Sequence, residues 1–441
     1  MTADLQTIAG SHTSELTPIA RVSACLERIA ERNDMIRAMI FLDADAALRE
    51  AHRLEAELAT GRSRGPLHGV PIAVKDVIDV SGWPTTGGSR LFEGRIASED
   101  APVVSALREQ GAIIIGKTNL HELTAGGHAN PWFGTVVNPL AEDRGTGGTS
   151  SGSAAAVAAG FCEAALGTDT GGSNRSTAAA TGLYGLKPTN GTIDTTGILP
   201  TAPSFDTVGP IAGSLELARL VHFAMTGRAA PKRERVSPSG LTIGLCPDLH
   251  AATLDAAVDE AHEAWLRDAR NNGARITTLS FPQAEQVAKA GLAILAYEFA
   301  TQYGDLIAAK PESVGEAVHA FVETGLAIDG PAYHAALAFR AETQGAFLRL
   351  LRSVDVLAAP VAPGLAPRLL DETTMVGSDH VPYGPAGGTF RRWANFFGVP
   401  ALAVPLPIAG DLPAAIQLST PPLSENRLFA VANALGPKET D

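Results

Sequence analysis

Lysine and hydroxyl side chains in three stretches of this sequence are candidate catalytic groups. Lys75 ends a β-branched run, a hydroxyl cluster comprises Thr149, Ser150 and Ser151, and Ser173 follows the pair Gly171-Gly172. A neutral lysine can take the proton of a serine through a second hydroxyl, so nucleophilic catalysis of this kind needs no histidine. Because the usual pKa of lysine is about 10.4, Lys75 would have to be desolvated or lie near positive charge. The alternative is an ordinary lysine at a strand end, paired with Asp76 or Asp79.

The glycine pair in front of Ser173 allows two interpretations. In the first, "GTDTGGSNR" (167–175) is a tight turn and nothing more. In the second, the turn points backbone N–H groups at negative charge that develops beside the serine hydroxyl. The residues alone leave both open.

Composition indicates an enzyme with a small-molecule substrate. The chain has 441 residues, of which 45% are hydrophobic, and its net charge is −13, which argues against a broad nucleic-acid footprint. The cysteines Cys25, Cys162 and Cys246 give no disulfide or zinc spacing, so we expect a reducing, cytoplasmic location. Residues 1–10 show no signal peptide, and the uncharged run 145–162 is too polar to span a membrane, so no membrane association is expected.

Strand and helix patterns alternate along the first half of the chain. Thr17-Pro18 predicts a helix start, a second helix is predicted over about 43–60, and "VPIAVK" and "AIIIG" predict buried strands. Residues 251–352 are mostly helical by pattern, and strand-like runs return near the C-terminus as "DVLAAP", "ALAVPLP" and "AAIQL". The alternation predicts an α/β sheet.

Two short motif matches do not survive a physical test. Residues 111–118, GAIIIGKT, fit the phosphate-loop pattern, but three consecutive isoleucines make the segment itself a strand. Residues 148–152, GTSSG, fit the serine-hydrolase elbow, but the residues before them are loop-like, whereas the elbow follows a strand. No histidine lies in a context typical of a Ser-His-Asp triad.

The longer constellation resembles the amidase signature family. The run 147–191, "GGTSSGSAAAVAAGFCEAALGTDTGGSNRSTAAATGLYGLKPTNG", is similar to the defining segment of that family, and motifs before and after it are similar as well. The resemblance implies a single α/β domain over 1–441, with a mixed, twisted β-sheet covered by helices on both faces. Its expected parts are N-terminal helices (1–65), a signature core (66–212), a mostly helical lobe (213–352) and a C-terminal return to the sheet (353–441).

The resemblance also implies hydrolysis of a carbon–nitrogen amide bond of a small molecule to an acid and ammonia, through a serine acyl-enzyme. Ser173 corresponds to the nucleophile and Lys75 to the terminal base. The position 24 residues before Ser173, where the family has its middle serine, holds Thr149, with Ser150 as the alternative relay hydroxyl. The family seats that hydroxyl on a cis peptide bond, here Gly148–Thr149.

The remaining expectations concern the surroundings of the nucleophile. The N–H groups of Thr170, Gly171, Gly172 and Ser173 correspond to the oxyanion hole, and Asp169 and Arg175 to a structural pair. No metal or organic cofactor is expected, and a homodimer is left open. Two other functions stay possible: the A subunit of a glutamyl-tRNA amidotransferase complex, whose members are usually longer, and an inactive scaffold of the same fold.

Overall fold

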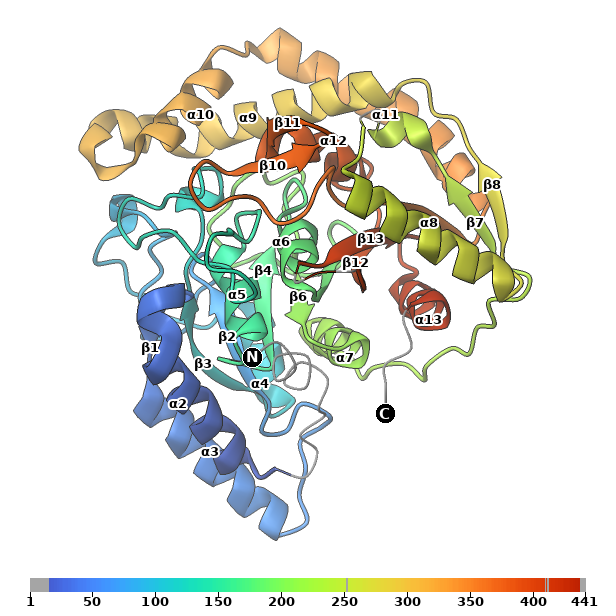
Figure 1. Cartoon of the computed structure of the whole chain (residues 1–441). Coiled ribbons are helices and arrows are strands. Elements are labelled where there is room, and N and C mark those ends of the chain that lie inside the picture. The colour runs from blue at the N-terminus through green and yellow to red at the C-terminus, as the bar shows by residue number, and fades with distance from the viewer. Residues whose placement is uncertain (1–15, 251–252, 409, 411, 437–441) are drawn as a thin grey trace.

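Eleven strands of the described residues form one mixed sheet that crosses the centre of Figure 1. The computed structural model describes residues 16–250, 253–408, 410 and 412–436; the expectation about a signal peptide concerns residues 1–10 and lies outside them. The strands are β1 (Met39–Leu42), β2 (Pro71–Lys75), β3 (Ile113–Thr118), β4 (Ala164–Thr168), β5 (Tyr184–Lys187), β6 (Val208–Ala212), β7 (Thr242–Leu245), β8 (Arg275–Thr278), β9 (Val356–Pro360), β12 (Ala401–Leu406) and β13 (Ala414–Ser419). Their order is β1-β3-β2-β4-β6-β5-β12-β13-β9-β7-β8.

The large sheet contains two groups of parallel strands, and its remaining strand pairs are antiparallel. β2 is parallel to both β3 and β4, and β7 is parallel to both β8 and β9, whereas the other neighbouring pairs of this sheet are antiparallel. A separate hairpin consists of β10 (Thr373–Val376) and β11 (Asp379–Pro382).

Helices surround the sheet on all sides in Figure 1. They are α2 (Pro18–Ile36), α3 (Ala44–Ala59), α4 (Pro102–Glu109), α5 (Ser151–Ala158), α6 (Ser173–Thr181), α7 (Leu215–Met225), α8 (Ala256–Asn271), α9 (Ala284–Ala309), α10 (Glu316–Leu326), α11 (Gly330–Arg352), α12 (Tyr383–Phe396) and α13 (Glu425–Leu435). The first helix starts as the sequence predicts, because the Thr17 hydroxyl accepts a hydrogen bond from the N–H of Ala20 and proline occupies the first turn.

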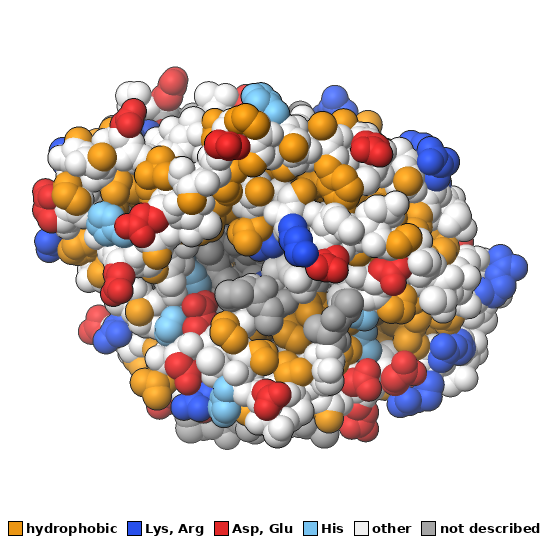
Figure 2. Space-filling model, turned by 90° about the horizontal axis from the view of Figure 1, so that it is seen from above, with side chains coloured by type: hydrophobic (Ala, Val, Ile, Leu, Met, Phe, Trp, Pro, Cys, Tyr) orange, Lys and Arg blue, Asp and Glu red, His pale blue; other side chains and the backbone are white. Residues whose placement is uncertain are grey.

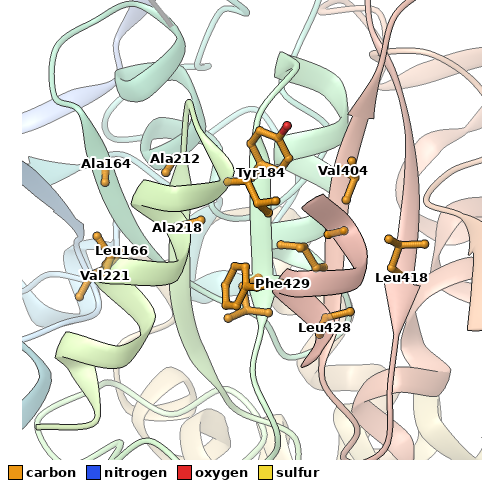
Figure 3. Close-up of a cluster of buried hydrophobic side chains, with 14 of the residues drawn as sticks. Ala164, Leu166, Tyr184, Ala212, Ala218, Val221, Val404, Leu418, Leu428 and Phe429 are labelled. Atoms are coloured by element: carbon orange, nitrogen blue, oxygen red, sulfur yellow. The ribbon is translucent and has the colours of Figure 1, made fainter. Parts of the chain in front are cut away.

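Alternate residues of the central strands belong to two separate hydrophobic cores. Ile72 and Val74 of β2 pack in one core with residues of α7, α8 and α13, part of which is shown in Figure 3. Ala73 packs in the other core with the small residues of α5 and α6. Since side chains of a strand alternate between faces, Lys75 points to the same face as Ala73, toward α5 and α6. The expected fold class, one α/β domain with a mixed sheet covered on both faces, is confirmed.

Two details differ from the expectations or extend them. The segment 213–352 contains helices, but it also contributes β7 and β8 to the edge of the large sheet. β8 is short and half-exposed, so its sequence lacks the apolar run that marks the buried strands. Residues 113–118 of the phosphate-loop match form β3, and therefore cannot curl around a phosphate.

Candidate active site

Ser173 lies at the first position of α6, directly after a turn that begins where β4 ends. Gly172 has φ +114°, a left-handed conformation that favours glycine, and a Cβ on it would lie 2.6 Å from Cβ of Arg391. The residue before Ser173 must therefore be glycine both for its conformation and for space. Ser173 itself is partly exposed.

A chain of two hydrogen bonds connects Ser173 to Lys75. Oγ1 of Thr149 lies 2.8 Å from Oγ of Ser173 and 3.1 Å from Nζ of Lys75. Thr149 is partly exposed like Ser173, whereas Lys75 is fully buried. The structure thus brings together the three residues that the sequence singled out, with a reachable hydroxyl at one end and a desolvated amine at the other.

Ser150 also contacts Lys75, but its hydroxyl is not part of the hydrogen bonds that join Ser173, Thr149 and Lys75. Its Oγ lies 3.2 Å from Nζ of Lys75, and its single proton is within reach of two acceptors, the carbonyl of Thr168 and Oδ1 of Asn174, each 3.0 Å away. No hydrogen bond joins Ser150 to the Ser173 hydroxyl in the described part of the chain. Geometry therefore favours Thr149 over Ser150 as the link.

The expected cis bond before Thr149 is absent. No described residue follows a cis peptide bond, so the Gly148–Thr149 bond is trans and that expectation is wrong. The physical reason is that a non-proline cis bond costs about 2.5–4 kcal/mol, and the trans backbone places Oγ1 of Thr149 within hydrogen-bond distance of both neighbours without it.

Lys75 is not paired with either of the nearby aspartates. Asp76 forms an ion pair of 2.7 Å with Lys117, and Asp79 forms one of 2.5 Å with Arg95. Burial lowers the pKa of Lys75 to about 7, although the charges of Asp169 and Asp206 act in the opposite direction. The alternative of a strand-end lysine paired with Asp76 or Asp79 is wrong, and the desolvation of Lys75 favours its neutral form.

Three hydroxyl oxygens surround Nζ of Lys75, and in its ammonium form Nζ donates to each of them. Besides Thr149 and Ser150, the side chain of Thr168 lies 2.9 Å from Nζ. A neutral amine has two N–H donors and one lone pair. Because the proton of Ser150 goes to a carbonyl or amide oxygen, Ser150 accepts from Lys75, and if Thr168 accepts the second N–H, the lone pair is free to accept the proton of Thr149.

The turn before Ser173 offers backbone donors, but fewer than expected. The N–H of Gly172 donates to Oδ1 of Asp169, 2.9 Å away, so it is already engaged. The N–H groups of Thr170, Gly171 and Ser173 have no acceptor among the described residues. The turn can therefore present three amides, rather than four, to an oxyanion beside Ser173.

Asp169 and Arg175 form a fully buried ion pair that braces this turn. Nη2 of Arg175 lies 3.0 Å from Oδ1 of Asp169. Burial raises the pKa of Asp169, but the Arg175 charge and hydrogen bonds outweigh it and hold the pKa near about 2. Arg175 also donates to Oδ1 of Asn395 and to Oε1 of Gln417, both 2.8 Å away. The pair thus connects the turn to α12 and β13.

The described residues show neither a metal centre nor a membrane span. Nowhere in the described ranges do three His, Cys, Asp or Glu side chains group as metal ligands. No helix in that part of the chain combines the length and the apolar character needed to cross a membrane. On the face drawn in Figure 2, the coloured acidic and basic side chains are scattered among apolar ones and form no continuous patch of one sign.

Comparison with known proteins is consistent with this geometry. The family model described as Amidase matches residues 20–429. The A subunit of the glutamyl-tRNA(Gln) amidotransferase of Anaeromyxobacter sp. (strain K) is 33% identical, over 97% of this chain and 94% of the relative. A crystal structure of an amidase superposes with a TM-score of 0.90 at 33% identity and covers 98% of both chains.

A more distant neighbour has the same fold. The peptide amidase of Stenotrophomonas maltophilia superposes with a TM-score of 0.80 at 30% identity and covers 96% of this chain and 94% of its own. The family match spans nearly the whole chain, and the relatives that resemble it act on amide bonds by name. This chain belongs to the amidase signature family and is an amidase-type enzyme.

Proposed function

We propose that this protein hydrolyses the amide bond of a small molecule to a carboxylic acid and ammonia through an acyl-enzyme on Ser173. The observation that carries the proposal is the hydrogen-bonded chain from Ser173 through Thr149 to the buried Lys75. A serine hydroxyl is a weak nucleophile until a base removes its proton, and a lysine with a pKa of about 7 is such a base.

In acylation a proton moves along these hydrogen bonds from Ser173 to Lys75 and then back toward the leaving group. Thr149 passes its proton to Nζ of Lys75 and takes the proton of Ser173, whose Oγ forms a bond to the amide carbonyl carbon. The carbonyl oxygen becomes an oxyanion beside the free N–H groups of the turn. The Lys75 ammonium then returns a proton through Thr149 to the leaving nitrogen, the carbon–nitrogen bond breaks and ammonia departs.

Deacylation repeats these steps with water. Water gives its proton to the Thr149–Lys75 chain while its oxygen bonds to the acyl carbon. Collapse of the second tetrahedral species returns the proton to Oγ of Ser173 and releases the acid. Each proton taken up by Lys75 is thus given back, and the enzyme ends in its starting state.

Covalent labelling tests the assignment of the nucleophile. The purified protein is treated with a sulfonyl fluoride, its intact mass is measured, and the adduct is located by peptide mapping. We expect one adduct on Ser173, loss of labelling and of ammonia release in S173A, and wild-type behaviour in S353A, a control that alters an exposed serine. An adduct on Ser150 would mean that the nucleophile has been misassigned.

A second candidate is favoured by the names of the curated relatives. These relatives include the A subunit of a glutamyl-tRNA amidotransferase, and 94% of that protein is covered by this chain. The alignment spans 469 positions and takes in nearly all of both chains, so coverage does not separate the two functions, and the expectation that such subunits are usually longer stays a prediction. The chemistry at Ser173 would be the same, but the amide would be that of glutamine and the ammonia would pass to a partner.

Ammonia release by the chain alone separates these candidates. The purified protein is offered aliphatic and aryl amides and glutamine, without ATP or other proteins. Rapid release from simple amides with slow release from glutamine supports a free-standing amidase. Release from glutamine alone supports the amidotransferase function, and no release from any amide together with no label on Ser173 supports an inactive scaffold.

A further inference from the structure

Two consecutive arginines of α12 lie against the turn that precedes Ser173. A Cβ added to Gly172 would lie 2.6 Å from Nε of Arg391, and one added to Gly171 would lie 3.9 Å from Nε of Arg392. α12 packs on α9 above the C-terminal end of the central strands (Figure 1). The side chains of both arginines therefore reach the turn before Ser173 from a segment more than two hundred positions away in the sequence.

Glycines on two helices, α12 and α9, leave the space that these arginines fill. Gly387 and Gly388 precede the arginines by one helical turn, and a Cβ on Gly388 would lie 2.6 Å from Nη2 of Arg392. On α9, a Cβ on Gly291 would lie 3.0 Å from Cδ of Arg392. Because helical side chains lean back toward the preceding turn, glycines at that spacing let the arginines fold down along α12.

Neither arginine has a carboxylate partner among the described residues. Arg391 is 4% exposed and donates from Nη1 to the carbonyl of Val361, 2.9 Å away, whereas its Nε is buried without a partner. Nε of Arg392 is likewise buried without a partner. Asp169, whose charge acts on Arg391, is already bonded to Arg175, Asn395 and the N–H of Gly172.

Two neighbouring guanidinium groups without a carboxylate are costly to the protein, and the Tyr383 ring, 5.7 Å from Cζ of Arg391, offsets only part of that cost. Burial lowers the pKa of Arg391 and lowers that of Arg392 to about 10, and the charge of Arg391 adds to the second shift. Buried charges in proteins are normally paired or bind a ligand. A guanidinium also presents N–H groups in a fork that matches a carboxylate.

We propose that the substrate carries a carboxylate on its acyl part, so that it is a half-amide of a dicarboxylic acid, and that Arg392 binds this carboxylate with Arg391 behind it. This inference rests on the proposed hydrolysis at Ser173. The partly exposed Arg392 meets the substrate, and the buried Arg391 adds positive charge and positions the end of α12 against the turn. The carboxylate replaces the missing acidic partner.

Matched pairs of amides test this substrate class. Succinamate and butanamide have the same chain length, and a carboxylate replaces a methyl group; glutaramate and pentanamide form a second such pair. We expect kcat/KM of the wild-type protein to be at least tenfold higher for the anionic member of one pair. R392Q should lower that ratio at least tenfold, R392K should lower it less, and R349Q, which alters an exposed arginine of α11, should leave it unchanged.

Binding provides a readout that needs no turnover. Succinate is titrated calorimetrically into S173A and into S173A carrying R392Q, and we expect binding only by the former. Equal binding by both variants, or equal rates for both members of each amide pair with Ser173 still labelled, overturns this inference and leaves the proposed function standing. No hydrolysis of any amide and no label on Ser173 overturns both.

Discussion

Nζ of Lys75 lies 2.9 Å from the side-chain oxygen of Thr168, a residue of the signature run 147–191 for which no role was expected. Lys75 ends β2 and Thr168 ends β4, and these strands are parallel neighbours in which Val74 is paired with Leu166. Parallel strands bring their carboxyl ends to the same edge of a sheet, so the two side chains meet there. The hydroxyl of Thr168 therefore positions Nζ of Lys75, the last group in the hydrogen-bonded series Ser173–Thr149–Lys75.

Replacement of Thr168 by valine should change the pH dependence as well as the rate. Valine keeps the shape of threonine but removes the oxygen that accepts from Lys75. Because that oxygen favours the protonated amine, its loss should lower the pKa of Lys75 and shift the acid limb of kcat/KM to lower pH, while imprecise positioning lowers kcat about tenfold. T343V, which alters a buried threonine whose hydroxyl bonds within α11, should leave the profile unchanged. An unshifted limb in T168V would argue against this contact.

The wild-type enzyme should lose activity as the pH falls through about 7, the pKa to which burial lowers Lys75. The sign follows from the role: the base must be neutral to accept a proton, and below its pKa it is protonated. K75A should lower kcat by several orders of magnitude, and K75R, which stays charged, should be inactive at every pH. Pre-steady-state and steady-state rates between pH 5 and 9 measure this.

A second buried lysine provides the control for that assignment. Burial lowers the pKa of Lys187 to about 7 as well, but its Nζ donates to the carbonyl of Pro188 and to Oδ1 of Asn190. If K187M folds, its activity should therefore still fall as the pH drops through about 7, as in the wild type. Loss of the limb in K187M with its retention in K75A would assign the titration to the wrong lysine.

The sequence predicted the parts of the site that lie within its motifs. Lys75, Thr149 and Ser173 belong to short runs whose residue types restrict the chemistry. Thr168 lies within the signature run, but its role was missed together with those of Asn395 and Gln417, because all three roles depend on contacts between segments far apart in the chain. A usable signal existed only for Thr168, since it ends a buried strand that a parallel sheet would place beside Lys75.

The same reasoning explains which elements were found. Buried strands such as β3 have continuous apolar runs, and α2 and α3 carry capping residues at their starts. β8 was missed because it is a short edge strand with charged and hydroxyl side chains, and such strands form only when a neighbour supplies the pairing. The trans bond before Thr149 could not be read from residue types at all.

Removal of the Asp169 carboxylate should destabilise the whole protein. D169N leaves Arg175 with its charge buried and unpaired, and loss of one partner of a buried pair costs about 3–5 kcal/mol. Chemical denaturation with two optical probes measures the free energy of unfolding. E285Q breaks the exposed pair with Lys289 and should cause no measurable change. Equal stability of D169N and wild type would mean that the turn is held by other contacts.

Substitutions at positions 149 and 150 decide which hydroxyl completes the relay. Thr149 forms hydrogen bonds with both Ser173 and Lys75. Ser150 contacts Lys75 but not Ser173, and its proton goes to an oxygen of Thr168 or Asn174. T149S keeps the hydroxyl and should stay within about tenfold of wild-type kcat. T149V is nearly isosteric but cannot transfer a proton, and should lose about 10²–10⁴-fold, the usual contribution of a general acid or base.

The comparison with S150A makes the result specific to the relay. S150A removes an acceptor of Lys75 but leaves the Ser173–Thr149–Lys75 chain intact, so its loss of kcat should be clearly smaller than that of T149V. Labelling of Ser173 by the sulfonyl fluoride should slow in T149V in proportion to kcat, because both reactions need the serine to lose its proton. If T149V instead reacted at wild-type rate and S150A did not react, the proton would travel through Ser150, and the shorter contacts of Thr149 would be structural.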